Sequence, residues 1–234
     1  IAFTKIGSTL RVSNNYDPKF FPGTYARIEK NNKFSQIYIA AEKKLYLPDF
    51  WRDGVCLGHG KTDNIELLAK CIDLWLTTAV STKQLSDKFN FVVPDKDAAI
   101  FDEGKEVEHK WQSILHDPHK KEIKSFVKLA INDKVLSRLF PFTSLYTLCF
   151  SRCTGFPYDT INLPSVTPKQ FENFISSKLI DFKQQETNQL EGQFVVTLNK
   201  EKFLGIGSAE EALKIVKANL PDNVQPARKG TADE

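Results

Sequence analysis

Short apolar runs separated by turn residues dominate the first third of the chain, the pattern typical of β-strands. Asn31-Asn32 lies between two such runs, and Asn tolerates the left-handed backbone that a tight hairpin turn requires. The simplest arrangement of these strands is an antiparallel meander. The predicted strands cover residues 9–13, 25–30, 36–40, 44–47 and 54–57.

From residue 63 onward the period changes, because apolar residues recur every three or four positions and so share one helix face. Asp63 is the expected N-cap, with Glu66 adding negative charge to the first turn. Residues 94–104 are polar and predict a loop. The apolar positions of this central helix are Ile65, Leu68, Ala69, Ile72, Trp75, Leu76 and Ala79.

Two further helices are predicted around 107–115 and 123–131, separated by Pro118, which lacks the amide proton needed inside a helix. The pattern then returns to strands, at 145–151, 193–198 and 202–206. We expect the last two to form a hairpin, with three residues between them. A final helix begins at the capping box of Ser208 and Glu211 and ends before Asn219-Leu220-Pro221.

The order of these elements predicts an α+β fold: an N-terminal antiparallel β-meander, central helices, and a C-terminal β-hairpin followed by a helix. We expect one domain over 1–234, with the alternative of two subdomains, 1–93 and 105–221, joined by the polar loop. Residues 222–234 are polar and should be loosely held unless they fold back.

Composition sets limits on the partners and the compartment. A net charge of +3, with lysines interleaved among acids, does not favour a nucleic-acid partner. No run of 18 apolar residues predicts a membrane span, and the start at Ile1 lacks the basic-then-apolar pattern of a signal peptide. The cysteines have no disulfide-scaffold spacing, so we expect reduced thiols and a cytoplasmic protein. They are Cys56, Cys71, Cys149 and Cys153.

Metal binding is the first chemistry to weigh, because two residues separate Cys56 from His59 and His116 from His119. Four such ligands would suffice for zinc. However, the second pair flanks Pro118 at a helix end, and Cys56 is equally typical of a buried strand residue. We therefore expect no metal and no cofactor.

Other constellations have ordinary structural interpretations. Asp49, Asp53 and His59 surround Trp51 and could mimic a hydrolase cluster, although 47–49 and 53–54 are turn-forming sequences. The glycine-containing segment 205–208 follows a strand and precedes a helix, but the third glycine of a dinucleotide-binding loop is missing. The four-residue spacing of Cys149 and Cys153 indicates packing thiols rather than a redox pair. We assign no catalytic residue.

Residues 151–158 are the least ordinary segment. Arg152, among hydroxyls and aromatic rings, could bind a carboxylate or phosphate through its planar guanidinium, with Tyr158 adding a hydrogen bond. The alternative is an aromatic turn that closes the core, since Gly155 and Pro157 are turn formers. The candidate binding residues are therefore Arg152, Tyr158 and, at a second position, His59.

The segments FPFTS (140–144), FSRCTGFP (150–157), LGIG (204–207) and the closing NLP and GTAD resemble an uncharacterised bacterial family sometimes labelled natural-product biosynthesis proteins. The resemblance implies a small bacterial accessory protein, without a known catalytic residue set. In that setting we expect a non-catalytic immunity protein that binds and neutralises a cognate toxin. The alternative is an accessory enzyme or small-molecule-binding protein with its site near Arg152.

Overall fold

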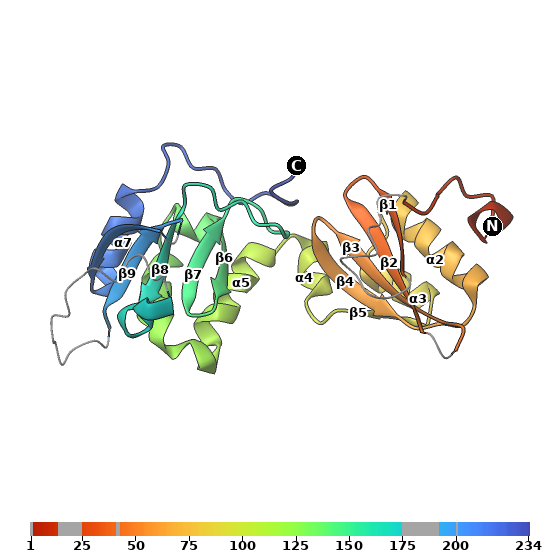
Figure 1. The fold of residues 1–234 in the computed structure, drawn as a ribbon, viewed down its shortest axis with the longest axis horizontal. Coiled ribbons are helices and arrows are strands. Elements are labelled where there is room, and N and C mark those ends of the chain that lie inside the picture. Colours follow the sequence, from red (N-terminus) through yellow and green to blue (C-terminus); the bar gives the residue numbers. More distant parts are fainter. Residues whose placement is uncertain (1, 14–24, 41–42, 175–191, 200) are drawn as a thin grey trace. The chain divides into compact units, whose positions relative to one another are not determined.

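The computed structural model describes residues 2–13, 25–40, 43–174, 192–199 and 201–234. The chain divides into two compact units, Ile1–Lys105 and Glu106–Glu234. Within the described residues, each unit contains one five-stranded antiparallel sheet together with helices (Figure 1). The α+β class is thereby confirmed. The change of unit falls at the end of the polar stretch 94–104.

The sheet of unit 1 is a meander whose strands lie side by side in chain order, as predicted. Asn31, with a φ of 54°, occupies the turn between the first two strands. Asp53-Gly54 forms the turn between the third and fourth, with φ values of 54° and 73°. The strands are β1 (Tyr25–Lys30), β2 (Lys33–Ala40), β3 (Leu45–Arg52), β4 (Val55–Gly60) and β5 (Val92–Pro94).

Two predictions for unit 1 were wrong. Residues 9–13 form no strand and instead follow a short helix, α1 (Ala2–Lys5). Residues 47–49 are not a turn, because β3 continues through Pro48 to Arg52. The register of β3 with β4 begins at Asp49, so the missing amide proton of Pro48 lies beyond that paired stretch.

The helices of unit 1 also differ from the prediction at their ends. The N-cap of α2 (Ile65–Thr77) is Asn64, whose side chain accepts hydrogen bonds from the amides of Glu66 and Leu67, and not Asp63. The stretch predicted as a loop, 94–104, begins at the last residue of β5 and contains the helix α4 (Ala98–Glu103), whose Ala98 and Phe101 lie three residues apart and face the core. A further helix that was not predicted, α3 (Thr82–Lys88), begins at a capping box formed by Ser81 and Gln84.

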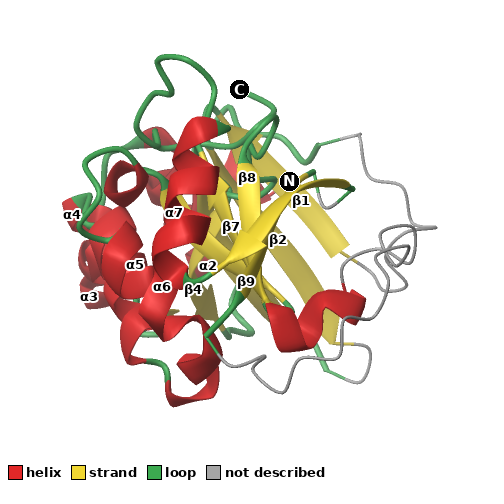
Figure 2. Ribbon diagram, turned by 90° about the vertical axis from the view of Figure 1, so that its left-hand side faces the viewer, coloured by secondary structure: helices red, strands yellow, loops and turns green. Residues whose placement is uncertain are grey.

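The helices of unit 1 cover one face of its sheet, where the core lies (Figures 1 and 2). The opposite face carries half-buried and exposed side chains, with Trp51 near its centre. Fully buried core residues from the sheet and from α2 include Ile28, Phe50, Leu57, Leu68, Ile72 and Trp75.

Unit 2 contains a sheet with the strand order β10-β9-β8-β7-β6. Its C-terminal hairpin confirms the prediction, and β6 and β8 are additional strands. These two strands were not predicted because they contain prolines, at positions 141, 164 and 168, and proline is depleted in strands. The strands are β6 (Phe140–Ser144), β7 (Thr147–Ser151), β8 (Pro164–Pro168), β9 (Phe194–Leu198) and β10 (Lys202–Gly207).

Helices of unit 2 pack against this sheet to form the second core, which includes Trp111, Phe126, Phe150 and Phe194. The capping box of Ser208 and Glu211 is confirmed at the start of α7. The helical segments are α5 (Glu106–His116), η1 (Pro118–Ile123), α6 (Lys124–Ala130), η2 (Leu136–Arg138), η3 (Lys169–Phe174) and α7 (Ala209–Ala218).

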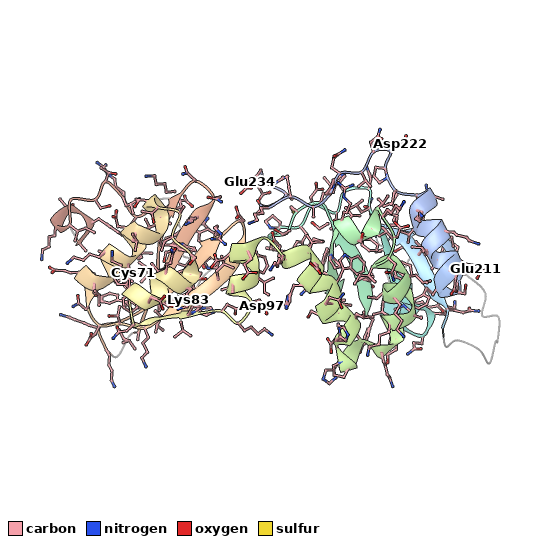
Figure 3. The ribbon with its side chains drawn as sticks, turned by 180° about the vertical axis from the view of Figure 1, so that it is seen from behind. Cys71, Lys83, Asp97, Glu211, Asp222 and Glu234 are labelled. Carbon is pink, nitrogen blue, oxygen red and sulfur yellow. The ribbon has the colours of Figure 1, made fainter. Side chains whose placement is uncertain are left out.

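The residues after α7 fold back onto unit 2. Figure 3 labels two residues of this segment, Asp222 and Glu234. The amide of Ala227 donates to the carbonyl of Arg138 at 2.8 Å. Three further backbone hydrogen bonds connect the segment to residues 154–157: Thr154 N to Arg228 O, Gly155 N to Gly230 O, and Ala232 N to Pro157 O.

Candidate functional site

The loop after β7, residues 152–162 and hereafter the Arg152 loop, contains two of the three candidate binding residues. Arg152 binds the chain's own Asp159: Nε donates to Oδ2 at 2.9 Å and Nη2 to Oδ1 at 2.7 Å. Nη2 also donates to the carbonyl of Ile161 at 3.2 Å. The carboxylate that this guanidinium holds is therefore internal, and the hydrogen bonds from Arg152 lower the pKa of Asp159.

Cys153 fixes the start of the same loop. Its sulfur is fully buried and accepts a hydrogen bond from the amide of Asp159 at 3.1 Å. The hydroxyl of Ser151 accepts from the amide of Cys153 and donates to its carbonyl. The four cysteines are all free thiols, and Cys153 acts here as a packing and hydrogen-bonding group, in line with the expectation for it.

Tyr158 belongs to an aromatic cluster. Its ring stacks on Phe142 with a centroid separation of 4.3 Å and lies 5.7 Å from Phe140. Phe156 meets it edge-on at 5.8 Å. Burial raises the pKa of the Tyr158 hydroxyl, so this phenol stays protonated at neutral pH. These contacts hold the aromatic turn against the sheet.

The same loop exposes two large apolar side chains. Phe156 is 71% exposed and Ile161 is 67% exposed, although the backbone between them is held by the Arg152–Asp159 ion pair and by the folded-back segment 227–232. An exposed aromatic side chain on a fixed backbone loses little conformational entropy when a partner covers it. The Arg152 loop therefore presents two large apolar side chains to solvent on a held backbone.

His59, the third candidate, lies in unit 1 on the sheet face opposite the helices. Its Nδ1 is 2.9 Å from Oδ1 of Asp49, the residue directly across from it on β3. Cys56 Sγ lies 3.9 Å from the same nitrogen. The register shifts by one residue within this stretch of β4, and this bulge turns Cys56 and His59 to one face.

Asp49, Cys56 and His59 form a group of potential metal ligands, hereafter the Asp49 triad, whose ligand atoms lie within 4.8 Å of one another. Burial raises the pKa of the Cys56 thiol to about 11. A metal ion would thus have to displace the thiol proton in order to bind sulfur.

The four ligands whose spacing suggested zinc are divided between the two units, and Cys56 and His59 belong to unit 1. His116 and His119 belong to unit 2, where His116 Nδ1 contacts the carbonyl of Gln112 at 2.8 Å. From sequence, Asp49 and His59 were grouped with Asp53, which lies in the turn between β3 and β4. The spacing of Cys56 and His59 indicated a potential ligand pair, and the β-bulge turns both side chains to one face.

The glycines of segment 205–208 serve helix packing. A Cβ on Gly205 would lie 2.7 Å from Cδ1 of Ile215 in α7, so a larger residue here would require the end of that side chain to move. At the helix start, the side chains of Ser208 and Glu211 already cap the backbone amides. An anion at this helix start would therefore have to displace the capping side chains from the backbone amides.

The fold defines a chain of two α+β units, each with an antiparallel sheet. A family of unknown function, DUF6193, matches residues 105–188, a range that includes Arg152 and Tyr158 but not His59. No curated protein and no solved structure matches the chain. Within the described residues, no helix is long and apolar enough to cross a membrane.

Proposed function

We propose that this protein is a non-catalytic bacterial binding protein, and specifically an immunity protein that neutralises a cognate toxin by direct contact. The observation that carries the proposal is the Arg152 loop, which exposes Phe156 and Ile161 on a backbone fixed by several hydrogen bonds. Large apolar side chains in such a setting are typical anchors of protein interfaces.

The partner suited to this loop presents an apolar pocket that accepts the ring of Phe156. Charge contributes little there, because Arg152 and Asp159 neutralise each other beside the two anchors. A partner that binds through shape and apolar contact does not require the acidic inhibitor surface that would steer a strongly basic toxin. The proposal includes cytoplasmic residence, which the four free thiols support.

The alternative, an accessory enzyme or small-molecule-binding protein of specialised-metabolite biosynthesis, places a ligand at Arg152. Such a ligand would have to compete with Asp159, which already occupies Nε and Nη2 of the guanidinium. Because breaking this internal ion pair costs free energy, Arg152 should bind an external carboxylate or phosphate more weakly than an unpaired arginine would. We therefore place the alternative second.

The test is co-purification of the tagged protein with the products of its adjacent genes, followed by calorimetry on any complex. Phe156→Ala should weaken a genuine complex by about 30-fold, the effect of a hot-spot residue worth about 2 kcal/mol. Leu145→Ala is the matched control, because Leu145 is 70% exposed but lies in the turn at the other end of β7. Failure to form any complex at micromolar concentration would contradict the proposal.

A further inference from the structure

The open face of the unit 1 sheet brings three side chains of different ligand chemistry to one point. Asp49 and His59 face each other across β3 and β4, and Cys56 joins them because of the bulge in β4. A regular strand alternates its faces and would send residues three apart to opposite sides of the sheet. The bulge is therefore the backbone feature that creates the triad.

Two of the distances between ligand atoms are close to those of a tetrahedral ion, and the third pair lies within 4.8 Å. For metal–ligand bonds of about 2.0 to 2.3 Å, the ligand atoms of a tetrahedral zinc site lie roughly 3.3 to 3.6 Å apart. Here Asp49 Oδ1 and Cys56 Sγ lie 2.9 Å and 3.9 Å from His59 Nδ1, so side-chain shifts of a few tenths of an ångström would suffice.

The backbone that bears these side chains is well fixed. The carbonyl of Asp49 accepts a hydrogen bond from the buried hydroxyl of Ser35 at 2.8 Å, which ties β3 to β2. On the opposite face, Phe50 and Leu57 anchor the two strands in the core. Ligands carried by packed strands are held more precisely than ligands carried by loops.

We propose that Asp49, Cys56 and His59 bind one divalent metal ion of the zinc class. The mixed oxygen, nitrogen and sulfur donors suit this borderline-soft ion better than Mg²⁺ or Ca²⁺, which take oxygen ligands. The His59 side chain is 60% exposed and the Asp49 side chain 20%, so the site opens to solvent on one side. Three protein ligands leave a fourth position for water or an exogenous ligand.

This inference is independent of the proposed function, because the triad lies in unit 1 and the Arg152 loop lies in unit 2. A metal ion here would add a reactive or regulatory centre to a chain in which we assign no catalytic residue. It would also give His59, a candidate from sequence alone, the role of a metal ligand.

The test is a titration of the untagged, reduced and chelator-treated full chain with Co²⁺, followed by competition with Zn²⁺. We expect one saturable site, thiolate-to-cobalt charge-transfer absorption, and displacement of Co²⁺ by Zn²⁺. Cys56→Ser should abolish the charge-transfer absorption although Cys71, Cys149 and Cys153 remain. No saturable binding up to about 100 µM metal would overturn the proposal.

His59→Ala and His119→Ala form the matched pair of variants. Loss of the His59 ligand should weaken binding by about tenfold or more, since even residues that only orient ligands have effects of this size. His119 is exposed and lies in unit 2, so its loss should leave binding unchanged. Equal binding by both variants would overturn the site. If Cys56→Ser fails to fold, this pair decides alone, because the exposed His59 ring contributes little to the core.

Discussion

Arg152 and Asp159 form a two-point ion pair, in which Nε and Nη2 of the arginine lie 2.9 Å and 2.7 Å from the two carboxylate oxygens. The amide of Arg152 also donates to the carbonyl of Asp159 at 3.0 Å, so backbone and side chain close the same seven-residue step. This geometry gives the arginine a direct structural role in holding the Arg152 loop. The ion pair acts together with the backbone hydrogen bonds between this loop and segment 227–232.

The energetic coupling of this pair can be measured with a double-mutant cycle. Both side chains are partly exposed, at 27% and 23%, so solvent screening reduces their attraction. We expect a coupling free energy of about 1 kcal/mol between Arg152→Ala and Asp159→Ala, above a typical exposed pair because the contact is bidentate. Lys83→Ala with Asp87→Ala, an exposed pair on α3, is the reference and should give roughly 0.3 to 0.5 kcal/mol. Coupling no larger than in the reference pair would refute the structural role.

Acid should weaken the same loop. The folded state lowers the pKa of Asp159 through the hydrogen bonds from Arg152. Below the unfolded pKa of about 3.9, the unfolded chain therefore binds more protons at this site, and stability falls as pH falls toward the folded pKa. Asp159→Asn should remove this part of the acid dependence. Peptide-resolved hydrogen exchange of residues 152–162 as a function of pH measures this effect. Asp117→Asn, outside the loop, is the control. Identical acid profiles for wild type and Asp159→Asn would count against the ion pair.

The fold class followed from sequence pattern more readily than the sites did. Period-2 and period-3.6 patterns found β1, α2 and α7, because each carries one apolar face, and β9 was found as a short run rich in β-branched residues. β8 was missed because it is buried along its whole length and has prolines at both ends, so it shows no alternation. Likewise, Arg152 was identified as unusual, but its partner lies seven residues away in an irregular loop that no period describes. The spacing of Cys56 and His59 suggested a ligand pair, but the β-bulge that turns both toward Asp49 is not encoded in that spacing.

Lys33 supplies a prediction at alkaline pH. Its ammonium is buried and donates to the carbonyls of Trp75 and Thr78 at the end of α2. Burial, with a smaller contribution from nearby Arg52, lowers its pKa to about 8. Between about pH 8 and the unfolded value near 10.4, the unfolded chain holds the extra proton, so this group's contribution to stability rises with pH.

The measurement must isolate Lys33, because burial raises the pKa of the Cys71 thiol and so acts in the opposite direction at high pH. We expect the stability difference between wild type and Lys33→Met to grow by about 1 to 2 kcal/mol from pH 8 to 9.5. Denaturant unfolding of the full chain at each pH, with hydrogen exchange of α2 as the local readout, measures it. Lys30→Met is the control, since Lys30 is exposed at the other side of the same turn. A difference that stays constant with pH would show that the lysine keeps its ordinary pKa.

The start of α2 offers a matched pair of cap variants. Asn64 accepts hydrogen bonds from two backbone amides, at 3.1 Å from Glu66 and 2.9 Å from Leu67. Asn64→Ala should destabilise unit 1 by about 1 kcal/mol, since it leaves those amides without a side-chain partner. Asp63→Ala, one residue earlier and exposed, should cost only a few tenths of a kcal/mol, roughly the size of its charge effect on the helix. Amide exchange at the first turn of α2 distinguishes the two, and a larger effect at Asp63 would reassign the cap.

The packing of α7 on β10 can be tested by removing one atom, Cδ1 of Ile215. A Cβ on Gly205 would lie 2.7 Å from Cδ1 of Ile215 but 3.5 Å from its Cγ1, an ordinary contact distance. Gly205→Ala should therefore destabilise unit 2 by about 1 kcal/mol through overpacking. Ile215→Val removes Cδ1, so Ala at position 205 should be tolerated in that background.

In the Ile215→Val chain, Gly205→Ala should be neutral or should stabilise by up to about 0.5 kcal/mol, because alanine restricts the unfolded chain more than glycine does. The double-mutant cycle thus has a predicted sign as well as a size. Hydrogen exchange of the β9–β10 hairpin in the full chain reads out unit 2 without interference from unit 1. Equal cost of Gly205→Ala in both backgrounds would mean that the glycine serves the bend beside the register shift at Phe203 and Gly205 rather than the contact with α7.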